Sequence, residues 1–191
     1  ERSVTIDNQT HNLGDGFMVI ATQNPIEQQG TYPLPEAQLD RFFMQVDIGH
    51  PDLDAERQIV VATTGATQQQ PEQVMDAEEL IQAQRLLRHV PVGESVAEAI
   101  LSLVRAGRPR SSSLPEVRNH VFWGPGPRAS QALMLAVRAR AVIEGRLAPS
   151  IDDVLALAHP ILRHRMALTF AAQAEGIQIG HVIDRLCEGI A

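Results

Sequence analysis

The pattern of hydrophobic and polar residues predicts a short β-containing part followed by a longer helical part. Residues 3–13 alternate between apolar and polar side chains around Asp7 and Asn8, two residue types that tolerate positive φ, and this predicts a β-hairpin. Residues 17–22 form a continuous apolar run, which is typical of a strand covered on both faces in a parallel sheet. Residues 44–48 predict a second short strand.

The segment between these two predicted strands is rich in turn residues. Asn24 precedes Pro25, so its backbone is restricted to extended geometry and the first strand ends there. A loop follows, and Pro35 then suits the first position of a helix over residues 36–43. This helix contains the sequence Asp40-Arg41-Phe42.

Beyond residue 51 the apolar residues follow a helical period. The spacing predicts helices over 53–63, 76–88, 95–106, 127–144, 150 onward with an interruption at Pro160, and 178–188. Capping boxes are expected at Asp76 with Glu79 and at Ser150 with Asp153, and residues 108–119 read as a loop. Three core faces are predicted: Val96, Ile100, Leu103 and Val104; Ala132, Leu135, Ala139 and Val142; and Val182, Ile183 and Leu186.

Composition narrows the class of protein. The chain has 191 residues, is 44% hydrophobic and carries a net charge of −7, and all its basic side chains are Arg because it contains no Lys. An acidic, Lys-free chain is a poor binder of nucleic acid. The single Cys187 excludes an internal disulfide and fits a reducing compartment, so we expect a cytoplasmic protein. No apolar run reaches the roughly 18 residues of a transmembrane segment, and the seven His suggest no metal site.

Three side chains are candidates for handling phosphate. Asn24 is expected at a strand tip, where its neutral amide can orient a water or a phosphate oxygen, although a loop cap is the alternative. Arg41 presents a planar guanidinium at a helix end, with an ordinary ion pair as the alternative. Arg128 is expected in the first turn of a helix, where a cation is unfavourable unless an anion binds beside it; an exposed Arg is the alternative.

The order of these motifs resembles the MoxR family of AAA+ ATPases. The resemblance is close at V-T-I-D, A-T-Q-N-P-I-E and G-T-Y-P-L-P-E-A-Q-L-D-R-F between residues 4 and 42. It continues more loosely at G-P-R-A-S-Q-A-L, at R-A-R-A and at I-D-D-V-L-A-L-A-H-P-I-L-R-H-R. The resemblance implies a predominantly helical fold, an α/β remnant of a P-loop AAA+ core followed by an all-α lid domain. The implied parts are residues 1–50 (core), 51–92 (connecting helices) and 93–191 (lid).

The resemblance also implies roles for the three candidates. Asn24 matches sensor 1, which places the attacking water, and Arg41 matches the arginine finger, which reaches the nucleotide of a neighbouring subunit. Arg128 matches sensor 2, which contacts phosphate from the lid. The implied protein is a homo-oligomeric ring, expected to be a hexamer, that uses ATP and Mg²⁺. It would remodel partner proteins in a chaperone-like way and work with von Willebrand A domain proteins.

The sequence departs from the family pattern in two ways. The phosphate-binding G-x-x-x-x-G-K-[ST] loop is absent, and no apolar strand ends in the Asp-Glu pair that would hold Mg²⁺. We therefore expect the chain to be part of a longer protein and, by itself, neither to bind ATP tightly nor to hydrolyse it. In the family's sheet order the 17–22 strand would lie between two missing strands. We expect it to pair instead with residues 44–48 or with another copy of the chain.

Two other functions compete with the ATPase. In the first, the chain is a non-catalytic interaction module whose helical lid docks a partner, and Asn24, Arg41 and Arg128 are idle. In the second, the C-terminal helices form a helix-turn-helix that binds nucleic acid, which their nearly balanced charge disfavours.

Overall fold

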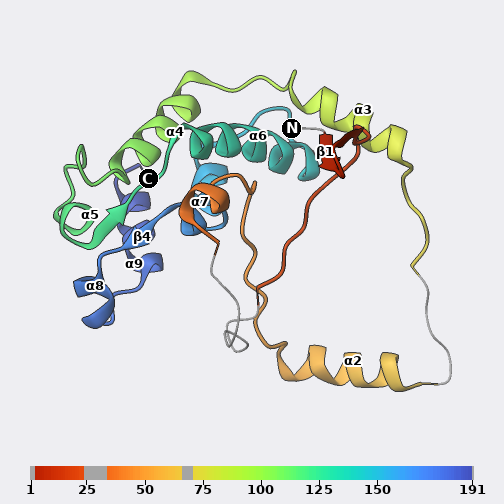
Figure 1. Ribbon diagram of the computed structural model, residues 1–191, viewed down its shortest axis with the longest axis horizontal. Helices are drawn as coiled ribbons and strands as arrows, with labels where there is room; N and C mark the ends of the chain where they lie inside the picture. The colour runs from red at the N-terminus through yellow and green to blue at the C-terminus, as the bar shows by residue number, and fades with distance from the viewer. Residues whose placement is uncertain (1–2, 24–33, 66–70, 191) are drawn as a thin grey trace. The chain divides into compact units, whose positions relative to one another are not determined.

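The structure is a computed structural model and describes residues 3–23, 34–65 and 71–190. Its contacts divide into two compact units: Glu1–Val19 with Val46–Ala83, and Ile20–Gln45 with Gln84–Ala191. The described chain is predominantly helical and carries two small two-stranded sheets (Figure 1). Each helix in these described ranges is too short or too polar to cross a bilayer. The three-part division expected from the sequence stays a prediction.

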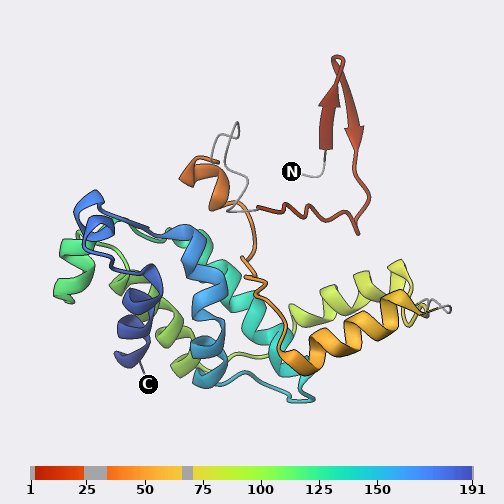
Figure 2. The same cartoon turned by 90° about the horizontal axis from the view of Figure 1, so that it is seen from below.

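The first unit contains the predicted β-hairpin. Strand β1 (Ser3–Ile6) pairs antiparallel with β2 (Gln9–Asn12), as Figure 2 shows. The turn residues Asp7 and Asn8 have φ of 49° and 62°. Two consecutive positive φ values are the geometry of a type I′ turn, whose twist matches that of the paired strands. The hairpin prediction is therefore confirmed.

Two helices follow with the caps that local chemistry favours. Helix α2 (Leu53–Thr64) begins at Asp52, whose Oδ1 accepts a hydrogen bond from the amide of Ala55 at 2.8 Å. Helix α3 spans Ala77–Leu87. Before it, Asp76 and Glu79 each accept the other's backbone N–H at 2.8 Å, which confirms the first capping box.

The prediction of β-strands at residues 17–22 and 44–48 is wrong. Residues 17–22 and 44–48 have no regular secondary structure, and the described residues contain no strand pairing between these two segments. Their large apolar side chains are exposed, with Ile20 at 76% and Ile48 at 93%. A strand exists only when a neighbour satisfies its backbone groups, and no described segment supplies that neighbour. Pairing with another copy of the chain stays a prediction.

The second unit is a helical bundle around one core (Figure 1). It contains α1 (Glu36–Leu39), α4 (Glu94–Ala106), α5 (Pro115–His120), β3 (Val121–Trp123), α6 (Pro127–Ile143), α7 (Ile151–Leu162), the 3₁₀ helix η1 (Arg163–Arg165), β4 (Ala167–Leu168), α8 (Phe170–Ala174) and α9 (Ile179–Glu188). Helices α4, α6, α7 and α9 pack on one another. Their fully buried residues include Leu103, Leu133, Ile161 and Ile183.

The predicted core faces of α4 and α9 are confirmed, and the predicted core face of α6 is largely wrong. All four residues predicted in α4 and all three in α9 are buried. In α6 the buried residues are Ala129, Ala132, Leu133, Ala136, Val137 and Ala141. Of the predicted stripe only Ala132 is among them, and Val142 is 42% exposed. This helix is rich in Ala and packs on both α4 and α7, so its sequence pattern does not distinguish the two sides.

Several local predictions in this unit also need correction. The predicted loop over 108–119 contains most of α5, whose first residue is Pro115. Strands β3 and β4, which pair antiparallel, were not expected. Pro160 does not interrupt α7, which continues to Leu162. A Pro inside a helix removes one backbone hydrogen bond, and here the helix continues for only two residues beyond it.

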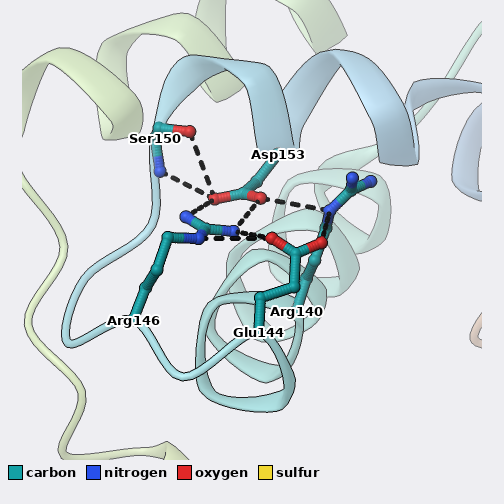
Figure 3. A network of polar contacts seen from close by, with 5 residues as sticks. All are labelled: Arg140, Glu144, Arg146, Ser150 and Asp153. Carbon is teal, nitrogen blue, oxygen red and sulfur yellow. Dashed lines mark hydrogen bonds and ion pairs between the residues drawn. The ribbon is translucent and has the colours of Figure 1, made fainter.

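A polar network fixes the connection between α6 and α7 (Figure 3). The buried carboxylate of Asp153 accepts two hydrogen bonds from Arg146, at 2.8 and 2.6 Å, and the backbone N–H of Ser150 at 2.8 Å. Arg140 and Glu144 complete the network. The hydrogen bonds from Arg146 hold the pKa of Asp153 below its ordinary value. The predicted capping box is confirmed.

Candidate functional site

Helix α1 ends two residues before the first candidate arginine, Arg41. It spans Glu36–Leu39, one turn shorter than the predicted helix over 36–43, and Asp40 is its C-cap. Arg41 is exposed and follows that cap. The carbonyl groups of Asp40, Phe42 and Phe43, which a longer helix would leave at its end, accept hydrogen bonds from a distant arginine instead. This tertiary contact explains the early end of the helix.

That arginine is Arg165, the last residue of η1. It is only 3% exposed. Its Nε donates to Oδ1 of Asp40 at 3.0 Å, and its two Nη atoms donate to the carbonyls of Asp40, Phe42, Phe43 and Ile161. Burial lowers the pKa of Arg165, and the charge of Asp40 opposes that shift. Asp40 is therefore the counter-ion of a buried cation.

Two more hydrogen bonds fasten the same segment to the end of α7. The Nε2 of His164 lies 3.2 Å from the carbonyl oxygen of Phe42, and since a carbonyl only accepts, Nε2 is the donor. The backbone N–H of Gln45 donates to the carbonyl of Pro160 at 2.8 Å. Burial, with the nearby charge of Arg165, lowers the pKa of His164. Residues 40–45 are thus tied along their length to residues 160–165.

The second candidate arginine lies beside the same carboxylate. Arg128 is in the first turn of α6, and its Nη1 is 3.7 Å from Oδ2 of Asp40. Its side chain is 55% exposed, so the ion pair is accessible to water. The N-cap of α6 is Gly126, which provides no side-chain cap. The first N–H groups of the helix therefore lack a side-chain acceptor and, with Arg128, favour an anion.

The backbone before α6 is held in place by a close contact. An added Cβ at Gly124 would lie 2.6 Å from the carbonyl oxygen of Gly107 and 2.9 Å from the Cα of Arg108. Only glycine allows this approach of two backbone segments. The Nε of Arg108 also donates to the carbonyl of Pro125 at 3.0 Å. Together these contacts fix where α6 begins, and hence the position of Arg128.

The structure brings two of the three predicted residues into one neighbourhood. Arg128 contacts Asp40, the residue that precedes Arg41. Asn24 lies outside the described residues. Among the described residues no three His, Cys, Asp or Glu side chains gather in a way that could hold a metal ion.

Sequence reasoning missed Arg165 and His164. They stand in a run of basic residues, Arg163-His164-Arg165, just after α7. Such a run normally reads as a solvated helix end that complements the helix dipole. The one signal against that reading is the strongly apolar sequence on either side of it. Their contacts with residues 40–43 cross more than 120 positions, so no local pattern reveals them.

Comparison with known protein families gives two matches. Residues 1–44 match the family described as "ATPase family associated with various cellular activities (AAA)", and residues 116–186 match the family described as "AAA lid domain". The first match contains Arg41 and the second contains Arg128 and Arg165. Both sides of the neighbourhood around Asp40 therefore fall within AAA-related sequence.

Individual proteins of known sequence or structure are similar to this chain over its whole length or almost all of it. Chaperone MoxR1 of Mycobacterium tuberculosis is 35% identical over 192 residues, which cover 100% of this chain and 51% of that protein. Uncharacterized protein YeaC of Bacillus subtilis is 37% identical and covers 100% of this chain and 57% of its own length. The crystal structure of a putative ATPase from Cytophaga hutchinsonii has a TM-score of 0.91 and 32% identity, covering 98% of this chain and 57% of that one.

The chain spans about half the length of these curated relatives. Within that span the matches agree with the observed fold: a small remnant of the ATPase core, represented by the hairpin and the α1 segment, and a predominantly helical lid. The chain belongs to the MoxR family of AAA+ ATPases.

Proposed function

We propose that the protein containing this chain is a ring-forming ATPase in which Arg41 is the arginine finger and Arg128 is sensor 2. Arg41 reaches the nucleotide of the neighbouring subunit, and Arg128 contacts phosphate from the lid. Asn24 is proposed as sensor 1, which places the attacking water. When bound, ATP with Mg²⁺ supplies the transferring phosphoryl group and neutralises part of its charge. The residues of this chain supply further positive charge and orientation.

One observation carries this proposal. Arg128 pairs with Asp40, and Arg41 is the next residue along the chain. Arg128 of α6 therefore contacts the residue that directly precedes the exposed Arg41. Arg128 lies 3.7 Å from the Asp40 carboxylate, and its own side chain is more than half exposed. An incoming phosphate can therefore replace the carboxylate as the partner of Arg128 at low cost.

The isolated 191-residue chain is proposed to be inactive towards ATP. Phosphate binding in this class depends on a loop that ends in Gly-Lys-Ser or Gly-Lys-Thr, and the sequence contains no Lys. Purified chain is expected to show no ATP turnover above buffer and no saturable binding of a fluorescent ATP analogue at micromolar concentration. ATP turnover by this chain would contradict the proposal.

The roles of the two arginines are tested in the full-length protein. Arg41→Ala is expected to lower kcat by about 10³-fold, the lower end of what arginine fingers supply in related phosphoryl-transfer systems, with ATP binding almost unchanged. Arg128→Ala is expected to lower turnover and to weaken the binding of ATP more than that of ADP. Arg57→Ala is the matched control, because Arg57 is exposed and pairs only weakly with Asp54, at 3.6 Å. Full turnover in Arg41→Ala would contradict the arginine-finger role, whereas a full-length protein without any ATP turnover would favour the non-catalytic interaction module.

We further propose that the ring couples hydrolysis to chaperone-like remodelling of partner proteins, with von Willebrand A domain proteins as partners and a hexamer as the assembly. A relative that matches the whole chain carries the name chaperone MoxR1, which supports this role. Mass measurement of the full-length protein with a non-hydrolysable ATP analogue tests ring size. Co-purification with von Willebrand A domain proteins of the same organism, compared with and without ATP, tests the partner.

A further inference from the structure

Arg165 uses every hydrogen-bond donor of its guanidinium group. A guanidinium has five N–H donors, and five acceptors surround this one. Four of the five bonds end on residues 40–43: on the carboxylate and carbonyl of Asp40 and on the carbonyls of Phe42 and Phe43. The fifth ends on Ile161 in the same helical segment as Arg165. The side chain therefore fixes the backbone on both sides of Arg41.

Stability alone does not account for this arrangement. Taking a guanidinium out of water is costly, and a buried ion pair is often no more stabilising than apolar residues of the same volume. The planar guanidinium of Arg165 instead holds its partners in a single geometry, because each of its donors has one acceptor in a fixed direction. The position of residues 40–43 is thus specified far more narrowly than apolar packing would specify it.

We propose that Arg165 is a positioning residue for Arg41: it holds the backbone of residues 40–43 against the lid, so that the side chain of Arg41 projects toward the neighbouring subunit. This inference rests on the proposed function of Arg41 as an arginine finger. The side chain of Arg41 is exposed and long, and its reach is set by its backbone. Because displacement of a catalytic group by about 1 Å costs roughly 100-fold in rate, the anchor affects hydrolysis in the neighbour.

The arrangement also ties the finger to the lid. Arg165 follows α7, and α7 packs on α6, which carries Arg128. Asp40 is shared between Arg165 at 3.0 Å and Arg128 at 3.7 Å. Movement of the lid would therefore also move the backbone of Arg41, because the hydrogen bonds of Arg165 join the two.

Steady-state kinetics of the full-length ring give the first test. Arg165→Gln is expected to lower kcat by about 100-fold, the cost of a misplaced catalytic group, while the affinity for ATP changes by less than about threefold. Arg165→Lys keeps the charge but offers three donors in place of five, so we expect it to restore only part of kcat. Arg146→Gln is the matched control, since it removes the arginine partner of the buried lid carboxylate Asp153 and lies outside the proposed site. Equal losses in Arg146→Gln and Arg165→Gln would overturn the proposal.

Mixed rings distinguish a positioning role of Arg165 for Arg41 from a purely structural role. In rings made from Arg165→Gln and Arg41→Ala subunits, no subunit supplies a competent finger, so turnover is expected to stay low. In rings that combine Arg165→Gln with subunits lacking the phosphate-binding lysine, intact fingers face intact nucleotide sites, so turnover is expected to recover. The opposite pattern would place the effect of Arg165 in its own subunit's nucleotide site and overturn the proposal.

Hydrogen exchange tests the anchor independently of catalysis. In Arg165→Gln the backbone amides of residues 41–45 are expected to exchange faster by at least about tenfold, while those in the middle of α7 keep their protection. Unchanged exchange at residues 41–45 would overturn the positioning role. A full-length protein without ATP turnover would instead contradict the proposed function, and the exchange measurement would still decide whether Arg165 positions this segment.

Discussion

The carboxylate of Asp40 lies 3.7 Å from the guanidinium of Arg128, and the two residues belong to different AAA-related matches in the sequence. The other oxygen of the same carboxylate accepts a hydrogen bond from the buried Arg165. Asp40 therefore has a tightly held cation on one side and an exchangeable cation on the other. Arg41, the proposed arginine finger, follows it directly.

Removing the charge of Asp40 should destabilise the second unit. In Asp40→Asn the guanidinium of Arg165 stays buried without a counter-ion, which costs about 3 kcal/mol of unfolding free energy. Urea unfolding followed by circular dichroism at pH 7 measures the loss. Asp54→Asn is the control, because Asp54 is 85% exposed and its ion pair with Arg57 should contribute less than about 0.5 kcal/mol. Equal stabilities of the two variants would contradict the assigned pairing.

His164 should make the stability of the second unit sensitive to mild acid. Burial lowers its pKa in the folded chain, while the unfolded chain binds a proton near the ordinary value of about 6.5. The unfolded state therefore holds more protons below about pH 6.5, and stability falls as pH falls through this window. Thermal unfolding between pH 7.5 and 5 should show a smaller decline for His164→Gln than for the unaltered chain. His181→Gln, at an exposed position, should leave the decline in place.

Asp153 should control stability at lower pH and anchor the α6–α7 connection. Its pKa is lowered by hydrogen bonds from Arg146, so its contribution is complete above the ordinary value of about 4 and is lost as pH falls below it. Asp153→Asn should cost about 3 kcal/mol at pH 7, since it breaks a buried pair, and little at pH 2.5. Asp152→Asn in the same first turn is exposed and should cost about 0.5 kcal/mol. Chemical denaturation at both pH values distinguishes the two.

Gly124 should tolerate no side chain. In Gly124→Ala the new Cβ would lie 2.6 Å from the carbonyl oxygen of Gly107, so one backbone segment must move, at a cost of about 1–3 kcal/mol. The same shift displaces the start of α6, and in the full-length protein ATP binding should weaken along with stability. Gly49→Ala has no atom within 4 Å of its new Cβ and is the control. A stable Gly124→Ala chain with unchanged ATP binding would show that the loop does not fix Arg128.

Features that depend on neighbouring residues could be predicted from the sequence. The Asp7-Asn8 turn, the capping boxes at Asp76 and Ser150, and the buried faces of α4 and α9 all follow from groups within a few positions of one another. Their energies come from local backbone preference, side-chain capping and helical periodicity. The same kind of local signal identified Arg41 and Arg128 as candidate residues, and short local motifs also revealed the family resemblance.

Only the tertiary structure decided how those residues come together. The apolar run at residues 17–22 reads as a strand, yet a strand needs a partner, and none of the described segments pairs with it. The buried side of α6 depends on which helices cover it. The end of α1 depends on Arg165, whose contact with Asp40 spans 125 positions in the sequence. A pairing of that range is set by the folded path of the chain, which no local pattern of residues encodes.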